Sequence, residues 1–399
     1  MKTKTVFTIL LLHLLVGCAA VSWRPYFKNY EIKMGQGNER FLVNAKINGK
    51  PVSLALDTGS EGELDLFSPA AERVGVKFPA TAPGLGDATG KTLVHRTEPL
   101  PVEIFNANCR IPLYVAHVPV AVDVDGLVGW ELIADNITQI DVAGRSARFL
   151  DKIPAEVRHW TKLRLSRTSN VLALDIPGPH GNETLLIDTG NDGGVSLNPE
   201  RWKEWTRAHP DRPKTLQLYY MGGSGIVAGE ESWARQLSLG PLSLTDVPVS
   251  EASLTEQRMA TNYAATLGLV ALERLDLIVD GKAGAAYVRP RQGPFRPVPY
   301  NRAGMVFVPI DPSNSIKGES KAVVLEGGPA YQAGIRDGDM PLKLGNQWRT
   351  NWTTTPTFLA RKLPAGSKME LTLERGEKTF TTEVVLRDLF PPAASGSQQ

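Results

Sequence analysis

The sequence predicts a mainly β protein in which one unit occurs twice and is followed by a smaller, different unit. Three observations over its 399 residues favour this arrangement. Short apolar segments alternate with Gly, Pro and Asn turn signals from residue 36 to residue 290, which is typical of strands and hairpins. The order of these signals occurs twice within that range. A stretch rich in Arg and Pro, over 289–299, then separates the repeated part from the rest of the chain.

The first copy begins with a predicted strand over 41–47 and a returning strand over 51–56. Asn48-Gly49 lies between them, and this dipeptide is a strong signal for a tight hairpin turn because both positions tolerate positive φ. The second strand runs into an Asp-Thr-Gly motif at 57–59. A short helix is predicted over 68–75, with serine as its cap, proline in its first turn and glycine at its end.

The second copy repeats this order. A strand over 171–176, a turn and a strand over 184–187 lead into a second Asp-Thr-Gly motif at 188–190, 131 residues after the first. A helix capped by Asn198 follows. Two further pairs of positions match at a spacing of 139 residues: the apolar-apolar-Gly segments 127–129 and 266–268, and the aspartates Asp141 and Asp280.

The composition excludes several classes of protein. Hydrophobic residues make up 42% and charged residues 22% of the chain, so a disordered protein is excluded. The 44 basic and 42 acidic residues give a net charge of +2, which does not favour binding to nucleic acid. Two cysteines are too few for a disulfide scaffold or a Cys-rich metal site, and the six histidines show no close ligand spacing. No metal ion and no organic cofactor is expected.

Residues 1–17 have the features of an export signal: a basic start, a short apolar run and small residues after it. The run is too short to span a bilayer, which needs about 20 residues. The segment that ends at Cys18 resembles a bacterial lipobox, which implies cleavage before Cys18, lipid attachment to it and a tether over 18–35. Because Ala19 follows, the resemblance implies an outer-membrane lipoprotein of the bacterial envelope that faces the periplasm. An ordinary signal peptide cut nearby is the alternative.

Two Asp-Thr-Gly motifs, each at the end of an apolar strand and each followed by an apolar-apolar-Gly segment, resemble the pepsin and retropepsin family of aspartic peptidases. The resemblance covers residues 36–290. It implies a two-lobed fold of the double-psi β-barrel type, with lobe 1 over 36–155 and lobe 2 over 156–290. In this family the two motifs meet at a pseudo-two-fold axis.

The resemblance implies that Asp57 and Asp188 are the catalytic dyad. Two carboxylates in hydrogen-bond contact cannot both ionise, so aspartic peptidases share one proton between them. The ionised partner can take a proton from a water molecule, and the protonated partner can donate to the substrate carbonyl. Which aspartate carries the proton is a property of the pair.

Neighbouring residues are expected to support the dyad. Gly59 and Gly190 allow the tight turns and let backbone N–H groups approach the carboxylates. In the family the two threonines bond across the lobe interface, a role that the resemblance gives to Thr58 and Thr189; bonding within each turn is the alternative. Ser60 matches the family's usual hydroxyl residue beside the aspartate. Asn191 departs from it, and we interpret its amide as tuning the site.

A peptidase of this family also closes a mobile hairpin, the flap, over its substrate. The predicted flap and substrate-binding residues are Tyr219, Tyr220, Gly222 and Gly223 in the second copy and Gly86 and Asp87 in the first. In pepsins the flap tyrosine belongs to the first lobe, whereas here tyrosines occur only in the second segment. Either both hairpins act as flaps or the lobes have exchanged roles; glycine-rich surface hairpins are the alternative.

Residues 291–299 are expected to form a semi-rigid linker, and residues 300–390 resemble a bacterial PDZ domain. The resemblance rests on a strand over 322–325, a short helix that ends at Gly334, and the turn that follows it. The tail over 391–399 is small and polar, and it is expected to be flexible.

PDZ domains bind an extended or C-terminal peptide as an added strand and hold its carboxylate with backbone N–H groups. The expected carboxylate loop contains Gly304, Met305 and Val306. The alternative is that this unit only packs against the rest of the protein.

Together these features predict a lipid-anchored aspartic endopeptidase that acts on polypeptides, with a PDZ domain that recruits or gates them. A monomer suffices for activity because both lobes lie in one chain. The alternatives are a non-catalytic protein that keeps the cleft for holding peptides, which the departure of Asn191 from the family pattern favours, and an envelope scaffold that acts through its PDZ domain.

Overall fold

A computed structural model of the chain is mainly β, as the sequence predicts. It describes residues 25–35, 39–78, 85–86, 93–116, 123–167, 170–178, 181–220, 226–252, 263–310, 319–348 and 355–390. The predicted signal peptide, Cys18 and the tail from residue 391 lie outside the described residues. Within the described ranges, no helix is long and apolar enough to cross a membrane.

The described elements of the first copy are β2 (Phe41–Ile47), β3 (Lys50–Asp57), β4 (Leu64–Phe67), α1 (Ser68–Val74), β5 (Leu85–Gly86), β6 (Leu93–Arg96), β7 (Leu100–Ile104), β8 (Ala107–Ile111), β9 (Tyr114–Ala116), β10 (Gly126–Gly129), α2 (Trp130–Ile133), β11 (Ile137–Asp141) and β12 (Ser146–Leu150). Within the range 18–35, which was expected to be a tether, β1 (Glu31–Met34) pairs with β2 and β12. Asn48 and Gly49 have φ of 51° and 75°, so the β2–β3 hairpin closes on the turn that the sequence predicts. One detail of the prediction is wrong: Ser68 is the first residue of α1, and Phe67 occupies the cap position.

The described elements of the second copy are the 3₁₀ helix η1 (Ala155–His159), β13 (Thr161–Leu165), β14 (Ala173–Gly178), β15 (Gly181–Ile187), β16 (Val195–Leu197), α3 (Pro199–Ala208), β17 (Lys214–Tyr220), β18 (Ile226–Leu239), β19 (Leu242–Glu251), β20 (Tyr263–Leu267), α5 (Leu269–Leu272), β21 (Leu275–Asp280) and β22 (Ala285–Pro290). Asn198 caps α3 as predicted, because its side-chain oxygen accepts from the backbone N–H of Arg201 at 2.9 Å.

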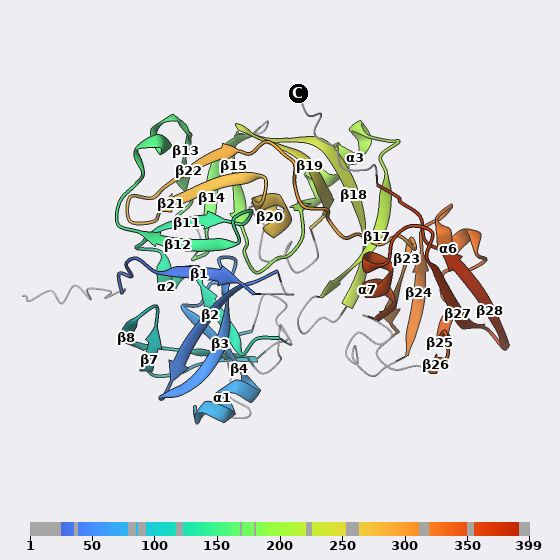
Figure 1. The fold of residues 1–399 in the computed structure, drawn as a ribbon, viewed down its shortest axis with the longest axis horizontal. Helices are drawn as coiled ribbons and strands as arrows, with labels where there is room; N and C mark the ends of the chain where they lie inside the picture. Colours follow the sequence, from blue (N-terminus) through green and yellow to red (C-terminus); the bar gives the residue numbers. More distant parts are fainter. Residues whose placement is uncertain are drawn as a thin grey trace, which may run out of the picture.

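The two copies are joined by strand pairing and by a common core. The 22 described strands from β1 to β22 belong to one sheet, in which β11 pairs antiparallel with β21. One apolar cluster extends from Phe27 in the first copy to Val288 in the second. The repeat therefore builds one large body, which Figure 1 shows from the blue to the yellow part of the chain.

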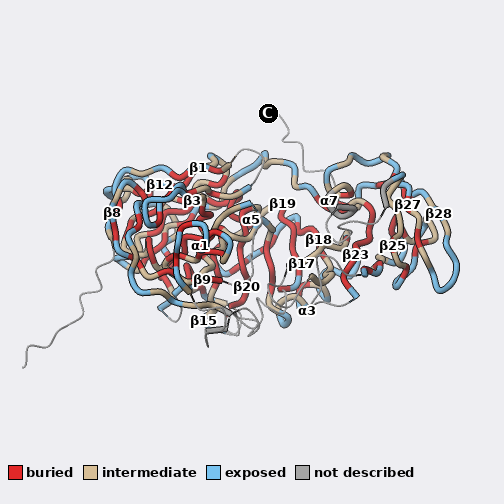
Figure 2. Tube along the Cα trace, turned by 90° about the horizontal axis from the view of Figure 1, so that it is seen from below, coloured by how far each residue is buried: buried red, intermediate tan, exposed pale blue. Residues whose placement is uncertain are grey.

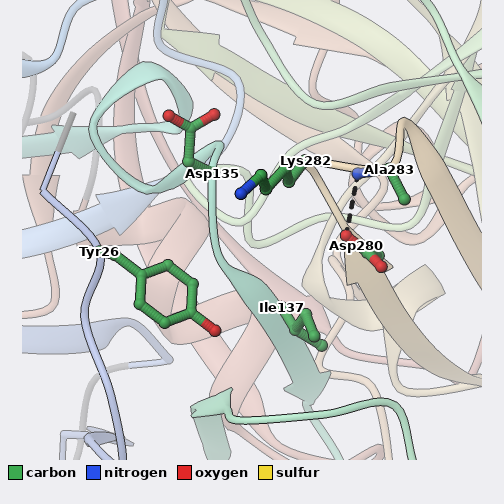
Figure 3. Close-up of a pocket in the computed structure, with 6 residues that line it drawn as sticks. All are labelled: Tyr26, Asp135, Ile137, Asp280, Lys282 and Ala283. Atoms are coloured by element: carbon green, nitrogen blue, oxygen red, sulfur yellow. Dashed lines mark hydrogen bonds between the residues drawn. The ribbon is translucent and has the colours of Figure 1, made fainter. Parts of the chain in front are cut away.

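Asp141 and Asp280, which the sequence places at equivalent positions of the repeat, have the same local role. Each ends a strand, and each carboxylate accepts a backbone N–H from the turn that follows. The Asp141 carboxylate bonds Gly144 at 2.8 Å, and the Asp280 carboxylate bonds Ala283 at 3.0 Å (Figure 3). Both aspartates thus stabilise hairpin turns.

The C-terminal unit contains β23 (Met305–Pro309), β24 (Ser320–Val324), α6 (Pro329–Gln332), β25 (Met340–Leu344), β26 (Gln347–Trp348), α7 (Thr355–Lys362), β27 (Lys368–Arg375) and β28 (Lys378–Val385). The strand β23 pairs with β24, and the order of the other sheet is β26-β25-β27-β28. A separate apolar cluster between Ala303 and Leu386 forms the core of this unit. Pro341 lies in β25 beside a register shift, where a proline is tolerated.

This unit packs against the hairpin of β17 and β18 through β23 (Figure 1). Figure 2 shows buried segments of the three strands next to one another. The buried hydroxyl of Thr215 donates to the backbone oxygen of Asn301 at 2.5 Å, and the Asn301 amide donates to the backbone oxygen of Leu216 at 2.9 Å. The contact between the two bodies is therefore buried and specifically hydrogen-bonded.

Candidate functional site

Asp57 and Asp188 are carried by strands at equivalent positions of the two copies. Asp57 ends β3, which pairs in parallel with β10, and Asp188 follows β15, which pairs in parallel with β20. The apolar-apolar-Gly segments that the sequence singles out form β10 and the end of β20. A β-carbon at Gly129 would lie 1.8 Å from the backbone oxygen of Gly62, so the close packing behind the first motif requires glycine there.

Thr58 and Thr189 connect the two motifs by reciprocal hydrogen bonds. The backbone N–H of each threonine donates to the hydroxyl of the other, at 3.1 Å in both directions. The Thr58 hydroxyl donates to the backbone oxygen of Ile187 at 2.6 Å, and the Thr189 hydroxyl donates to that of Leu56 at 2.8 Å. Both threonines are buried, at 0% and 1% exposure. The bonds cross between the copies, as the resemblance implies, and are not confined to each turn.

The two aspartate side chains are hydrogen-bonded to each other at the centre of this arrangement. The Gly59 N–H donates to Asp57 and the Gly190 N–H donates to Asp188, each at 2.9 Å. Each glycine also lies against the opposite aspartate. A β-carbon would lie 2.7 Å from the Asp188 carboxyl carbon if placed at Gly59, and 2.4 Å from that of Asp57 if placed at Gly190.

The surroundings of Asp57 favour its protonated form. Burial raises the pKa of Asp57 above its usual range, although hydrogen bonds from Asp188 and Gly59 and the charge of Arg40 oppose this shift. A carboxyl that keeps its proton beside a second carboxyl can donate a hydrogen bond while its partner accepts one.

Ser60 and Asn191, which follow the two motifs, make different contacts. The Ser60 hydroxyl donates to the Asp65 carboxylate at 2.5 Å. The Asn191 backbone N–H donates to the Asp188 carboxylate at 3.2 Å, while the Asn191 side-chain oxygen accepts from the Gly193 N–H at 2.8 Å. The asparagine amide thus shapes the loop that leaves the second motif.

Two charged residues beside the dyad, Asp65 and Arg40, could not be predicted from the sequence motifs. Burial, together with the charges of Asp57 and Glu63, raises the pKa of Asp65 to about 6, against the hydrogen bond from Ser60. Arg40 donates from its guanidinium to the backbone oxygen of Gly190 at 3.3 Å, so it links the first copy to the second motif. Neither residue belongs to a motif, although Arg40 directly precedes the first predicted strand of the repeat.

The predicted flap residues are described in part. Tyr219 and Tyr220 end β17, which forms an antiparallel hairpin with β18, and the Tyr219 hydroxyl accepts from the Gln217 amide. Gly86 lies in β5 and pairs with Leu93 of β6. The remaining predicted flap residues, Gly222, Gly223 and Asp87, lie outside the described residues.

The predicted carboxylate loop lies at the start of β23. Gly304 has φ of 62°, and its backbone oxygen accepts from the Leu325 N–H at 2.8 Å. Met305 and Val306 are 2% and 1% exposed, respectively. The loop is therefore buried beneath the contact between β23 and the β17–β18 hairpin.

In the part of the chain that the structure describes, no three His, Cys, Asp or Glu side chains are grouped so that they could hold a metal ion. No protein-family model matches the chain, and no curated protein matches it either.

Proposed function

We propose that this protein is an aspartic endopeptidase with a pepsin-like two-lobed fold, in which Asp57 and Asp188 share a proton and activate water. The reciprocal bonding of Thr58 and Thr189 is the observation that carries the proposal. It ties the two Asp-Thr-Gly turns to each other through buried groups and keeps the two carboxyl groups in contact. A merely structural pair of turns has no need to bring two carboxyl groups together, because that contact raises the cost of ionising them.

The chemistry follows from one proton held between two carboxyl groups. The ionised carboxylate takes a proton from a water molecule as the water oxygen bonds to the peptide carbonyl carbon. The protonated carboxyl gives its proton to the carbonyl oxygen, which forms a neutral tetrahedral intermediate. Its collapse breaks the C–N bond: the protonated aspartate gives its proton to the leaving nitrogen, and one hydroxyl of the intermediate gives its proton to the ionised aspartate. The dyad therefore ends with one proton, as it began. The N–H groups of Gly59 and Gly190 hold the two carboxylates in place.

The proposal extends to the other predicted parts of the chain. The C-terminal unit acts as a PDZ domain that binds extended or C-terminal peptides along β23. Since β23 is buried against β17 and β18, binding there requires this contact to open. Cys18 carries the lipid anchor at the bacterial outer membrane, facing the periplasm, and one chain suffices for activity.

Cleavage of a peptide library between pH 3 and pH 8 tests the proposed activity. The wild type is expected to cut peptides, and Asp57→Asn and Asp188→Asn are each expected to lose cutting, because the remaining carboxyl cannot supply both proton transfers. Intact folding of both variants is the control. If the wild type cuts no peptide but binds peptides tightly, the protein is a peptide-binding protein and the proposed activity is wrong.

A further inference from the structure

A cavity of about 180 Å³ lies where the loop after Asp188, the helix α5, the segment 296–299 and the helix α7 meet. Its wall includes Gly193 and Gly194 from the loop. The charged residues that line it are Glu39, Asp192, Glu231, Glu273, Arg296 and Arg361. Four carboxylates therefore face two guanidinium groups, and one further positive charge would improve the balance.

Glu231 of β18 is the carboxylate in this wall that needs a partner. It is 4% exposed, and its Oε2 atom has no hydrogen-bond partner among the residues that the structure describes. Leaving a buried carboxylate oxygen without a donor is costly, so such groups normally bind a cation or a hydrogen-bond donor.

The two arginines of the wall have other partners. Arg296 donates to Glu273 and to Glu39, at 2.9 Å in both cases. Arg361 donates to the backbone oxygen of Pro299 at 3.0 Å. Burial raises the pKa of Glu231 to about 7. The positive charge of Arg361 opposes this shift, and the negative charge of Asp192 adds to it. The Glu231 carboxyl therefore ionises most readily when a cation occupies the cavity.

The cavity lies close to the proposed catalytic centre along the chain. Asp192 is four residues after Asp188, so the two backbones are at most about 14 Å apart. The loop between them is held by the bonds from Asn191 to Asp188 and from Gly193 to Asn191. An extended peptide covers this distance with about four residues.

We propose that this cavity is a binding site for the cationic side chain of a lysine or arginine in the polypeptide substrate, with Glu231 as its acceptor. The identification of the ligand as a substrate side chain rests on the proposed function. An organic cation fits better than a metal ion, because the described carboxylates are not grouped for metal binding.

A positional scanning library tests the site. Each peptide series carries lysine, arginine or the neutral isostere norleucine at one position on either side of the scissile bond. The wild type is expected to cut the lysine or arginine series at least about tenfold better at one position, and Glu231→Gln is expected to abolish that preference. Glu230→Gln is the matched control: Glu230 is the adjacent residue on β18 and binds Arg212, and the preference should persist.

Binding to the Asp57→Asn chain, measured by fluorescence anisotropy, provides a readout that does not depend on cleavage. A lysine peptide should bind at least about tenfold more tightly than its norleucine analogue, and the added Glu231→Gln change should remove the difference. Cleavage without any basic preference in the wild type would overturn this inference and leave the peptidase proposal intact. Lysine-dependent binding without cleavage would support the cation site at Glu231 and contradict the proposed peptidase activity. Equal binding of lysine and norleucine peptides would overturn the site.

Discussion

The space around Asp57 and Asp188 limits which residues can lie beside them. Gly59 and Gly190 each lie against the opposite carboxyl group, where a β-carbon would overlap with it. Glycine at these positions therefore allows the two aspartates to approach each other, in addition to allowing the turn.

Replacing Gly190 by alanine tests this role. The added β-carbon would lie 2.4 Å from the Asp57 carboxyl carbon, so the carboxyl groups must separate. Because a displacement of about 1 Å can cost about 10²-fold in rate, we expect Gly190→Ala to lower kcat/KM by that order. Gly293→Ala is the control, since its nearest atoms would be 3.5 Å away. Normal cleavage rates in a folded Gly190→Ala protein would contradict the prediction.

Asp65 predicts how stability depends on pH. Its pKa is raised to about 6 in the folded protein, against about 3.9 in an unfolded chain. The folded protein therefore binds this proton more tightly than the unfolded chain does. The contribution of Asp65 to stability is fully present below about pH 4 and is lost as the pH rises through about 6. A shift of about 2 pKa units corresponds to about 3 kcal/mol.

Asp65→Asn, which keeps an acceptor for Ser60 without a charge, is expected to raise the free energy of unfolding at pH 7 by up to about 3 kcal/mol. At pH 4 the difference from the wild type should vanish. Urea unfolding at the two pH values measures both quantities. A stabilisation of equal size at pH 4 would show that the ionisation of Asp65 is not its cause.

At the scale of elements, the threonines decide how the two copies meet. The β3–β10 and β15–β20 pairs each hold one motif in place, but the Thr58 and Thr189 side chains fix one motif against the other. Each hydroxyl donates one hydrogen bond and accepts another, so removing either hydroxyl breaks two bonds between the copies.

Thr58→Val keeps the shape of the side chain and removes its hydroxyl. The Thr189 N–H and the Ile187 oxygen would lose their partner in a buried site, which costs about 1–3 kcal/mol for each group. We expect a loss of at least about 2 kcal/mol in urea unfolding and a larger relative loss of cleavage. Thr58→Ser keeps the hydroxyl and should retain most of both. An unfolding free energy of Thr58→Val equal to that of the wild type would exclude a role in joining the copies.

At the scale of the whole molecule, the hairpin that carries Tyr219 is held at its base by the C-terminal unit. Trp233 of β18 packs on Phe390 with ring centroids 5.5 Å apart, and Tyr300 packs on Phe390 at 4.5 Å. The two bodies therefore share a small apolar cluster besides the bonds of Asn301. A change in the C-terminal unit can reach the β17–β18 hairpin through these contacts.

Asn301→Ala tests this coupling. The variant loses the donors to the backbone oxygens of Leu216 and Met305 and the acceptor for the Ala303 N–H. We expect a loss of at least about 2 kcal/mol, and unfolding of the C-terminal unit in a separate calorimetric transition. Lys368→Ala, which removes an exposed ion pair with Glu383 in the same unit, should cost less than about 1 kcal/mol. A single transition at the wild-type temperature in Asn301→Ala would contradict the coupling.

The sequence by itself determined the elements whose signals are local. The mainly β class, the Asn48-Gly49 turn and the Asn198 cap follow from the conformations that these residues prefer, and the structure confirms them. The spacing of the repeat also predicted that Asp57 and Asp188 occupy equivalent strand ends. These features need few distant contacts, so a pattern of residue types is enough to predict them.

Tertiary structure alone decided the features that depend on residues far apart in the chain. Asp65, Arg40 and Glu231 have no motif, and their burial and charge partners arise when separate strands pack together. The contact of β23 with β17 and β18 could not be predicted from the sequence either. Sequence patterns show that a strand has an apolar face, but they do not show which surface covers it. The ionisation of a carboxyl depends on its desolvation and on nearby charges, and only the folded chain determines both.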